Sequence, residues 1–301
     1  MNNPVVLLCC SMAANLLGTV LKKYVTNRTD DPTKLGYIFN TVSSAVAAAV
    51  LLGMNGFHVP SAFTVVLGIL FGVITALQQL SNVQALKLGP LSYTTVLCSL
   101  STLIPTLCGA IIWNERIALI QWCGICLMVG CFLLSVSSDP TEKKASLRWL
   151  GYCAVLFLCT GGIGVMQKWH QNTVYKEELD AFLLIAFVFS TVYSGIGLLL
   201  YRRKTKIENT SPTKESANST VWILLALIAV CGVCAALNNK WNLYLSGVME
   251  SAVFFPVVNG GGLILTTLSA LILFRERLGR RQWIGIVLGI LSVLCLCNPF
   301  T

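Results

Sequence analysis

Ten long apolar stretches take up most of this 301-residue chain, and they constrain its fold more than any other feature. The hydrocarbon core of a bilayer is roughly 30 Å thick, and a helix needs about 20 apolar residues to cross it. A mean hydropathy of +0.76 and a charged fraction of 11% agree with a chain that lies mostly in lipid. The stretches lack the period-two alternation of membrane β-strands, so we expect an all-α integral membrane protein. The expected transmembrane helices cover residues 4–21, 36–54, 62–86, 91–113, 120–136, 147–167, 181–201, 220–245, 251–274 and 282–297.

The basic residues are unevenly distributed around these helices. If all ten helices cross the membrane, successive connections lie on alternate sides. Seventeen of the 21 Lys and Arg residues then belong to odd-numbered connections, among them Lys22 directly after the first stretch. Cytoplasmic loops are enriched in Lys and Arg, so we expect the odd-numbered connections inside and both termini outside. The net charge of +9 is therefore explained by topology, and we expect no nucleic acid partner.

Nearly all of the thirteen cysteines lie within the apolar stretches. Two C-x-x-C pairs, Cys123–Cys126 and Cys231–Cys234, have no His or carboxylate nearby, whereas a metal site needs further ligands of that kind. Cysteine within a membrane behaves as a small apolar residue. We therefore expect no metal, no redox centre and no cofactor. The short termini favour a bacterial cytoplasmic membrane, with the lipid bilayer as the principal partner.

Motifs recur in the two halves of the chain at nearly constant offsets. Asn114-Glu-Arg-Ile and the later Gln121-Trp-Cys-Gly recur as Arg275-Glu-Arg-Leu and Gln282-Trp-Ile-Gly, at an offset of 161 residues. The offset shortens to 146 before residues 202–219, a polar connection that is about 14 residues longer than its counterpart. The sequence thus predicts two repeats of five helices, 1–138 and 139–301, with a solvated linker at 202–219. Five crossings per repeat place the repeats in opposite orientations, which is a transporter architecture.

Two five-helix halves, each with a tetrad that contains Glu-Arg before a Q-W-x-G motif, resemble the EamA-like family of the drug/metabolite transporter superfamily. The resemblance covers almost the whole chain. It implies a membrane carrier, and the inverted repeat would let a central site open first to one face and then to the other. Family members move amino acids, choline, nucleotide sugars, sugar phosphates or lipid-linked sugars, so the resemblance leaves the substrate open.

Polar residues recur near the ends of the third and eighth stretches. Positions three or four residues apart share one helix face, so each group forms a polar stripe that faces protein or water rather than lipid. Lining of a substrate cavity and hydrogen bonding between helices explain these stripes equally well. The two groups are Gln78, Gln79 and Asn82, and Asn238, Asn239 and Asn242.

A second group of candidates combines lysine and tryptophan with one carboxylate. We expect Lys168, Trp169, Lys240 and Trp241 to gather with Glu250 at one mouth of a central cleft. The lysines would bind an anionic group and the tryptophans would stack. Snorkelling lysines and an interfacial aromatic belt are the alternative, favoured for Lys168 and Trp169. A binding role is favoured for Lys240, because asparagines surround it within a helix.

The ninth stretch carries features that distort a helix. Pro256 removes one helical hydrogen bond, and Asn259 precedes three glycines. We expect Asn259 to line the substrate path, with close helix packing as the alternative. Glu250 is the candidate for proton coupling, because an ionisable residue beside a membrane segment is a functional hypothesis by default. Tyr93 is a weaker binding candidate, as are Tyr37, Asn40 and Thr94.

Two further kinds of motif favour structural roles. Glu115–Arg116 and its repeat are expected to pair charges and cap helix ends. The pairs Gly68–Gly72 and Gly285–Gly289 allow close helix approach, and a homodimer is one use of such a motif.

The sequence therefore predicts a secondary or facilitative transporter of a small polar metabolite, such as an amino acid or amine. The chain has no P-loop motif, so we expect no nucleotide-driven transport. An exchanger of an anionic substrate, such as a sugar phosphate or nucleotide sugar, is the first alternative, with Lys168 and Lys240 as its binding residues. A membrane scaffold or a lipid-acting membrane enzyme is the second. We expect no enzyme, because no nucleophile–base pair or set of catalytic residues occurs in a stretch.

Overall fold

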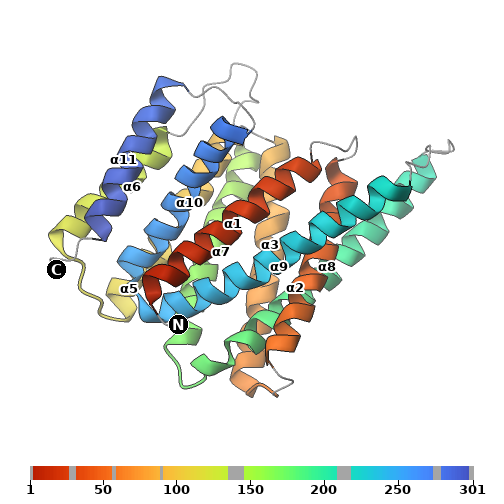
Figure 1. The fold of residues 1–301 in the computed structure, drawn as a ribbon, viewed down its shortest axis with the longest axis horizontal. Coiled ribbons are helices and arrows are strands. Elements are labelled where there is room, and N and C mark those ends of the chain that lie inside the picture. Colours follow the sequence, from red (N-terminus) through yellow and green to blue (C-terminus); the bar gives the residue numbers. More distant parts are fainter. Residues whose placement is uncertain are drawn as a thin grey trace. The chain divides into compact units, whose positions relative to one another are not determined.

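The computed structural model describes residues 3–26, 32–55, 59–88, 91–134, 146–208, 218–273 and 279–297. Helices dominate these residues, and no strand occurs among them (Figure 1). The first half contributes α1 (Pro4–Thr26), α2 (Pro32–Asn55), α3 (Ala62–Leu88), α4 (Leu91–Leu100), α5 (Leu103–Ile112) and α6 (Leu119–Leu134). The second half contributes α7 (Leu147–Gln171), the short 3-10 helix Lys176–Glu178, α8 (Leu179–Glu208), α9 (Asn218–Val248), α10 (Ser251–Leu273) and α11 (Arg280–Leu296).

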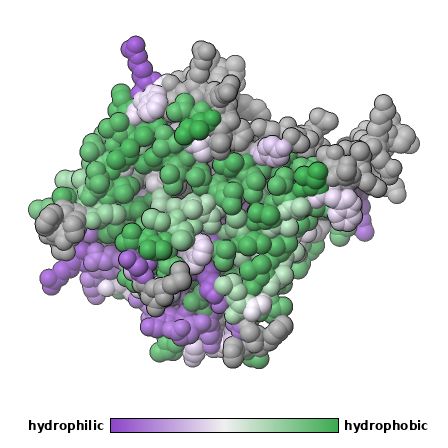
Figure 2. Space-filling view, in the orientation of Figure 1, coloured by the Kyte–Doolittle hydropathy of each residue, from purple (hydrophilic) through white to green (hydrophobic). Residues whose placement is uncertain are grey.

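Seven of the described helices are long and apolar enough to cross a membrane. Their apolar segments are Pro4–Lys22, Lys34–Asn55, Ala62–Asn82, Leu147–Gln171, Lys176–Arg203, Trp222–Val248 and Ser251–Ser269. Large hydrophobic side chains are also exposed on the helix surfaces, such as Ile111, Leu119 and Leu294. Figure 2 shows hydrophobic side chains over much of the face drawn. Such a surface suits contact with lipid, and the fold is that of an all-α, multi-pass membrane protein.

Two expected elements differ from the structure. The fourth stretch is not one helix, because it breaks at Ser101–Thr102 between α4 and α5. Pro105 explains the break, since its ring would clash with the carbonyl four residues earlier, that of Ser101. The linker expected at 202–219 is shorter, because α8 continues to Glu208 and α9 begins at Asn218. The rest of that linker, 209–217, lies outside the described residues, as does the second Glu-Arg motif at 275–278.

The chain forms two compact units, each built from segments of both sequence halves. Unit 1 comprises residues 1–12, 74–176 and 242–301, and unit 2 comprises residues 13–73 and 177–241. The boundaries fall within α1, α3, the 3-10 helix Lys176–Glu178 and α9. Packing therefore divides the chain differently from the repeats.

In unit 1, α10 packs against α5, α6 and α11, and α6 packs along α11 (Figure 1). Glycines set these close approaches. A Cβ on Gly124 of α6 would lie 2.8 Å from Leu296 Cγ of α11, and a Cβ on Gly289 of α11 would lie 2.9 Å from Cys131 Sγ of α6. The core between the helices is apolar and includes the fully buried Phe132 of α6.

In unit 2, α2 packs along α8, with a polar seam between them. Asn40 donates its Nδ2 hydrogens to Ser194 and Ser190, and the hydroxyls of Ser44 and Ser190 lie 3.1 Å apart. Asn40, a weaker candidate for substrate binding, thus holds two helices together. A Cβ on Gly72 would lie 2.9 Å from Phe189 Cβ of α8, so the Gly68–Gly72 motif serves packing within the chain.

Helices that occupy the same place in the two sequence halves pack against each other. The second helices of the halves, α2 and α8, form one such pair within unit 2. The fifth helices, α6 and α11, form another within unit 1. The fourth helices meet where α5 packs on α10.

Candidate functional site

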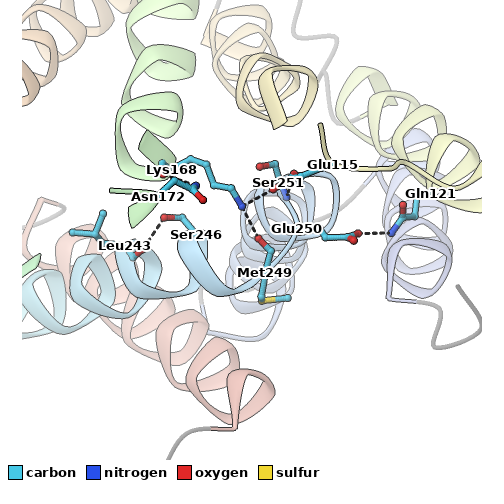
Figure 3. Close-up of polar contacts among 9 residues, drawn as sticks. All are labelled: Glu115, Gln121, Lys168, Asn172, Leu243, Ser246, Met249, Glu250 and Ser251. Carbon is cyan, nitrogen blue, oxygen red and sulfur yellow. Dashed lines mark hydrogen bonds and ion pairs between the residues drawn. The ribbon is translucent and has the colours of Figure 1, made fainter. Parts of the chain in front are cut away.

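A buried ion pair forms the centre of a polar cluster in unit 1 (Figure 3). Lys168 Nζ lies 2.6 Å from Glu115 Oε1 and donates a second hydrogen bond, of 2.9 Å, to the Met249 carbonyl oxygen. The second carboxylate oxygen of Glu115 accepts a 2.7 Å hydrogen bond from the backbone N–H of Ser251. We call Lys168, Glu115, Met249 and Ser251 the Lys168 cluster.

Local chain geometry places each member of the Lys168 cluster. Lys168 lies in the last turn of α7, and Glu115 follows α5 in a turn where Asn114 adopts the left-handed φ of 53°. Ser251 begins α10, so the Glu115 carboxylate sits at a helix N-terminus, where a negative charge is favourable. Gly109 makes room, because a Cβ there would lie 2.7 Å from Ser251 Oγ.

The ion pair is shielded from water, with 5% of the Lys168 side chain and 14% of the Glu115 side chain exposed. Removing two charges from water is costly, and the pair persists because both partners have further hydrogen bonds. The cluster therefore joins three separate parts of unit 1: α7, the turn after α5, and the α9–α10 connection. These contacts hold the three segments together.

These contacts correct the sequence-based interpretation of Lys168. Snorkelling was favoured, but the side chain is buried against Glu115 instead. Trp169, its neighbour, is 51% exposed, as an interfacial tryptophan would be. Glu115 has the structural role expected of it, because it both pairs a charge and caps a helix.

Glu250 lies beside the Lys168 cluster and points away from it (Figure 3). Its Oε2 accepts a 3.3 Å hydrogen bond from Gln121 Nε2 at the start of α6. The residue is exposed, whereas a partly buried acid is what a proton-coupling role would favour. Lys168 and Glu250 thus have different partners: Lys168 pairs with Glu115, and Glu250 accepts a hydrogen bond from Gln121.

Asn259 of α10 forms a hydrogen bond to the break between α4 and α5. Its Nδ2 donates to the Phe255 carbonyl in α10 at 2.9 Å and to Thr102 Oγ1 at the α4–α5 break at 3.2 Å. Asn259 is exposed, whereas Gly260 and Gly261 face side chains of α6 and α1. The glycines thus serve packing, and Asn259 keeps an accessible amide. Helix α10 continues through Pro256 without a break.

Other candidates of unit 1 hold helices together. Gln78 Nε2 donates to Thr160 Oγ1 of α7 at 3.3 Å. Asn242 Oδ1 accepts from Ser11 Oγ at 2.6 Å. Gln79 and Asn82 are half-buried. The Tyr93 side chain lies outside the described residues, although its backbone belongs to α4.

In unit 2, Lys240 also forms an ion pair. Its Nζ lies 2.7 Å from Asp180 Oδ2 at the start of α8, with 23% of the lysine side chain and 15% of the aspartate side chain exposed. Lys240 therefore holds α9 to α8. Its charge is compensated by Asp180, which weakens its favoured role as a substrate ligand. Its neighbour Trp241 is half-buried.

A cavity of about 170 Å³ lies in unit 2 between α1, α2 and α9. We call it the α1–α9 cavity. The predicted residues Asn238 and Asn239 line it, and Asn239 Nδ2 donates to the Ala235 carbonyl at 2.8 Å. The other described lining residues are Ala14, Asn15, Gly18, Thr19, Lys22, Phe39, Ser43, Cys231, Cys234 and Ala235.

The polar wall that α1 contributes was missed from the sequence. Asn15, Thr19 and Lys22 follow one another at spacings of four and three residues, so they share one face of the helix. Lys22 was placed in a cytoplasmic connection, but α1 continues to Thr26 and includes it. The spacing of these three residues could have identified the polar face, but the expected helix ended at residue 21 and left Lys22 out.

Comparisons with known proteins establish the fold alone. No family model and no curated protein matches the chain. A solved structure described only as "Crystal structure of protein" is similar to it with a TM-score of 0.69 and 13% sequence identity. The similarity covers 97% of this chain and 95% of that one.

Proposed function

We propose that this protein is a secondary or facilitative transmembrane transporter that moves a small polar metabolite by alternating access. The observation that carries the proposal is the pairing of equivalent helices from the two halves. Pairing of α2 with α8, α6 with α11, and α5 with α10 is what a two-fold relation between two five-helix repeats requires. Together with the recurring motifs, it supports an inverted repeat of the EamA-like type.

The interrupted fourth helix of the first half supports the same reading. Transporters bind substrate at helices whose backbone is broken within the membrane, because broken backbone is tolerated only beside protein or water. The α4–α5 break and the accessible amide of Asn259 fit that description. The α1–α9 cavity adds a second polar surface inside apolar helices. We place the protein in a cell membrane with both termini outside, on the distribution of its basic residues.

The inverted repeat has a direct test. Arg116 and Arg277 occupy equivalent connections of the two halves. In a variant whose native thiols do not react with a membrane-impermeant maleimide, Arg116→Cys and Arg277→Cys should be labelled from opposite sides of the membrane. Labelling of both from one side contradicts the inverted repeat.

Transport itself is tested with purified protein in proteoliposomes. Uptake and counterflow of radiolabelled amino acids, amines, small carboxylates and phosphates should identify at least one substrate that protein-free liposomes do not take up. Glu250→Gln tests proton coupling, because it removes the ionisable group and keeps the side-chain size. Loss of pH-driven uptake, with counterflow retained, is the result expected if Glu250 carries the proton. Unchanged pH-driven uptake removes Glu250 from this role.

A further inference from the structure

We propose that Cys231 and Cys234 of α9 form a dithiol site that binds one soft metal ion, Cu(I), in the wall of the α1–α9 cavity. The site lies within unit 2 and goes beyond the proposed transport function. Metal binding can be measured on the purified protein without transport.

The two thiols face the same residue of α1. Cys231 Sγ donates a hydrogen bond of 3.7 Å to the Gly18 carbonyl oxygen. A Cβ on Gly18 would lie 3.7 Å from Cys234 Cβ, so Cys234 borders the same residue. Both cysteines line the cavity, because positions three residues apart share one helix face. The fold thus gathers two sulfur ligands on one cavity wall.

The spacing of the two cysteines suits a metal ion held between them. Helix residues three positions apart have Cβ atoms roughly 5–6 Å apart. A zinc–thiolate bond is about 2.3 Å long, so an ion in line between two thiolates needs sulfur atoms about 4.6 Å apart. Rotation about the two χ1 angles covers the difference between these spacings. Neither cysteine is in a disulfide, so both sulfurs are available as ligands.

The number and kind of ligands select the metal. Among the described residues, no group of three or more His, Cys, Asp or Glu side chains could hold a metal ion. Structural zinc requires four ligands, so this pair does not suit zinc. Thiolates are soft ligands that select Cu(I), an ion that is stable with two ligands. We expected no metal from the sequence because further ligands are lacking, but a two-coordinate ion needs none.

Binding exchanges two protons for the metal ion. Each S–H bond breaks as a copper–sulfur bond forms, the protons pass to the buffer, and copper stays in its +1 state. Thr19 lines the cavity and is exposed, so the ion has a path from the surface. The sulfurs themselves are sheltered, with Cys231 4% and Cys234 8% exposed. Water therefore competes poorly for the bound ion.

Helix α6 provides a matched control. Cys123 and Cys126 have the same C-x-x-C spacing, but both are exposed and neither lines the cavity. The full-length protein in detergent is loaded with one equivalent of Cu(I) under nitrogen, with ascorbate present to keep the metal reduced. Competition with the chelator bathocuproine disulfonate gives the affinity, and X-ray absorption gives the number of sulfur ligands. Alkylation of each cysteine by N-ethylmaleimide, followed by peptide mass spectrometry, locates the ion.

One equivalent of Cu(I) should have two sulfur ligands and should slow alkylation of Cys231 and Cys234 together, whereas Zn²⁺ should protect them much less. Cys231→Ser and Cys234→Ser should each weaken Cu(I) affinity by about tenfold or more, because even an outer hydrogen-bond partner of a ligand contributes that much. The double variant Cys123→Ser, Cys126→Ser should bind Cu(I) like the unchanged protein.

Three results overturn the proposal. Cu(I) affinity is the same in Cys231→Ser as in the unchanged protein, the loss of Cys123 and Cys126 weakens it as much, or the bound copper has three or more sulfur ligands. If the Cys231 and Cys234 variants do not fold, alkylation of the unchanged protein decides, and equal protection of all cysteines contradicts a specific site. Cu(I) binding without metabolite uptake in proteoliposomes leaves this inference standing and contradicts the transport function. Uptake without Cu(I) binding does the reverse.

Discussion

Lys168 and Glu115, 53 positions apart in the chain, meet through a 2.6 Å contact between Nζ and Oε1 inside unit 1. Each partner also binds backbone at the start of α10: Lys168 through the Met249 carbonyl and Glu115 through the Ser251 N–H. One pair of side chains thus fixes the end of α7, the turn after α5 and the entry to α10.

Loss of one member of this pair should be costly. We expect Lys168→Met to lower the free energy of unfolding by about 3–5 kcal/mol, because it leaves a buried carboxylate without its counter-charge. The double variant Lys168→Met, Glu115→Gln should be more stable than Lys168→Met alone. Denaturant titration in detergent measures both, and Arg116→Gln, an exposed neighbour, is the control. Strictly additive effects would contradict coupling between the two residues.

Two adjacent glycines of α7 should respond differently to the same change. A Cβ on Gly161 would lie 2.7 Å from Ile104 Cβ of α5, whereas a Cβ on Gly162 meets nothing within 4 Å. Gly161→Ala should therefore destabilise the protein by about 1–3 kcal/mol through overpacking. Gly162→Ala should be neutral or stabilising, since alanine favours helix more than glycine does. Thermal unfolding of the two variants tests this contrast, and equal midpoints would argue against the close contact of α7 with α5.

Asn259 should matter more for transport than for stability. Replacing it with Leu removes the hydrogen bond to Thr102, and such bonds between membrane helices contribute about 0.6 kcal/mol. We expect a small change in the unfolding midpoint together with a clear change in the KM or rate of uptake. Thr102→Val, which removes only the acceptor, is the control. A large loss of stability with normal uptake would assign Asn259 to packing.

The ion pair of unit 2 should show coupling of its own. Lys240→Met leaves Asp180 partly buried, with an Oδ1 atom that has no hydrogen-bond partner among the described residues. We expect Lys240→Met, Asp180→Asn to unfold at a higher temperature than Lys240→Met. Guanidinium titration provides an independent measurement. If both variants unfold alike, the contact contributes as little as a typical surface ion pair does, despite its partial burial.

The sequence singled out several polar residues within the helices, but it did not reveal their partners. Asn238 and Asn239 were identified from their polarity within an apolar helix, and both line the α1–α9 cavity. Lys168 was expected to snorkel, whereas Lys240 was singled out because asparagines surround it within a helix. Their carboxylate partners, Glu115 and Asp180, lie 53 and 60 residues away, and no local pattern links residues at such separations.

The sequence by itself determined that the chain is helical and membrane-spanning, because the length and continuity of an apolar stretch are local properties that the bilayer selects directly. The helix break at Ser101–Thr102 was not predicted, because a proline does not by itself end a helix: α10 continues through Pro256, whereas the helix that contains Pro105 is interrupted. Only the tertiary structure decided which polar groups compensate one another and which remain accessible. Lys168 and Lys240 are chemically alike, yet one is paired with Glu115 in unit 1 and the other with Asp180 in unit 2. Their environments depend on how distant helices pack, and that packing arises from many weak contacts spread over the whole chain.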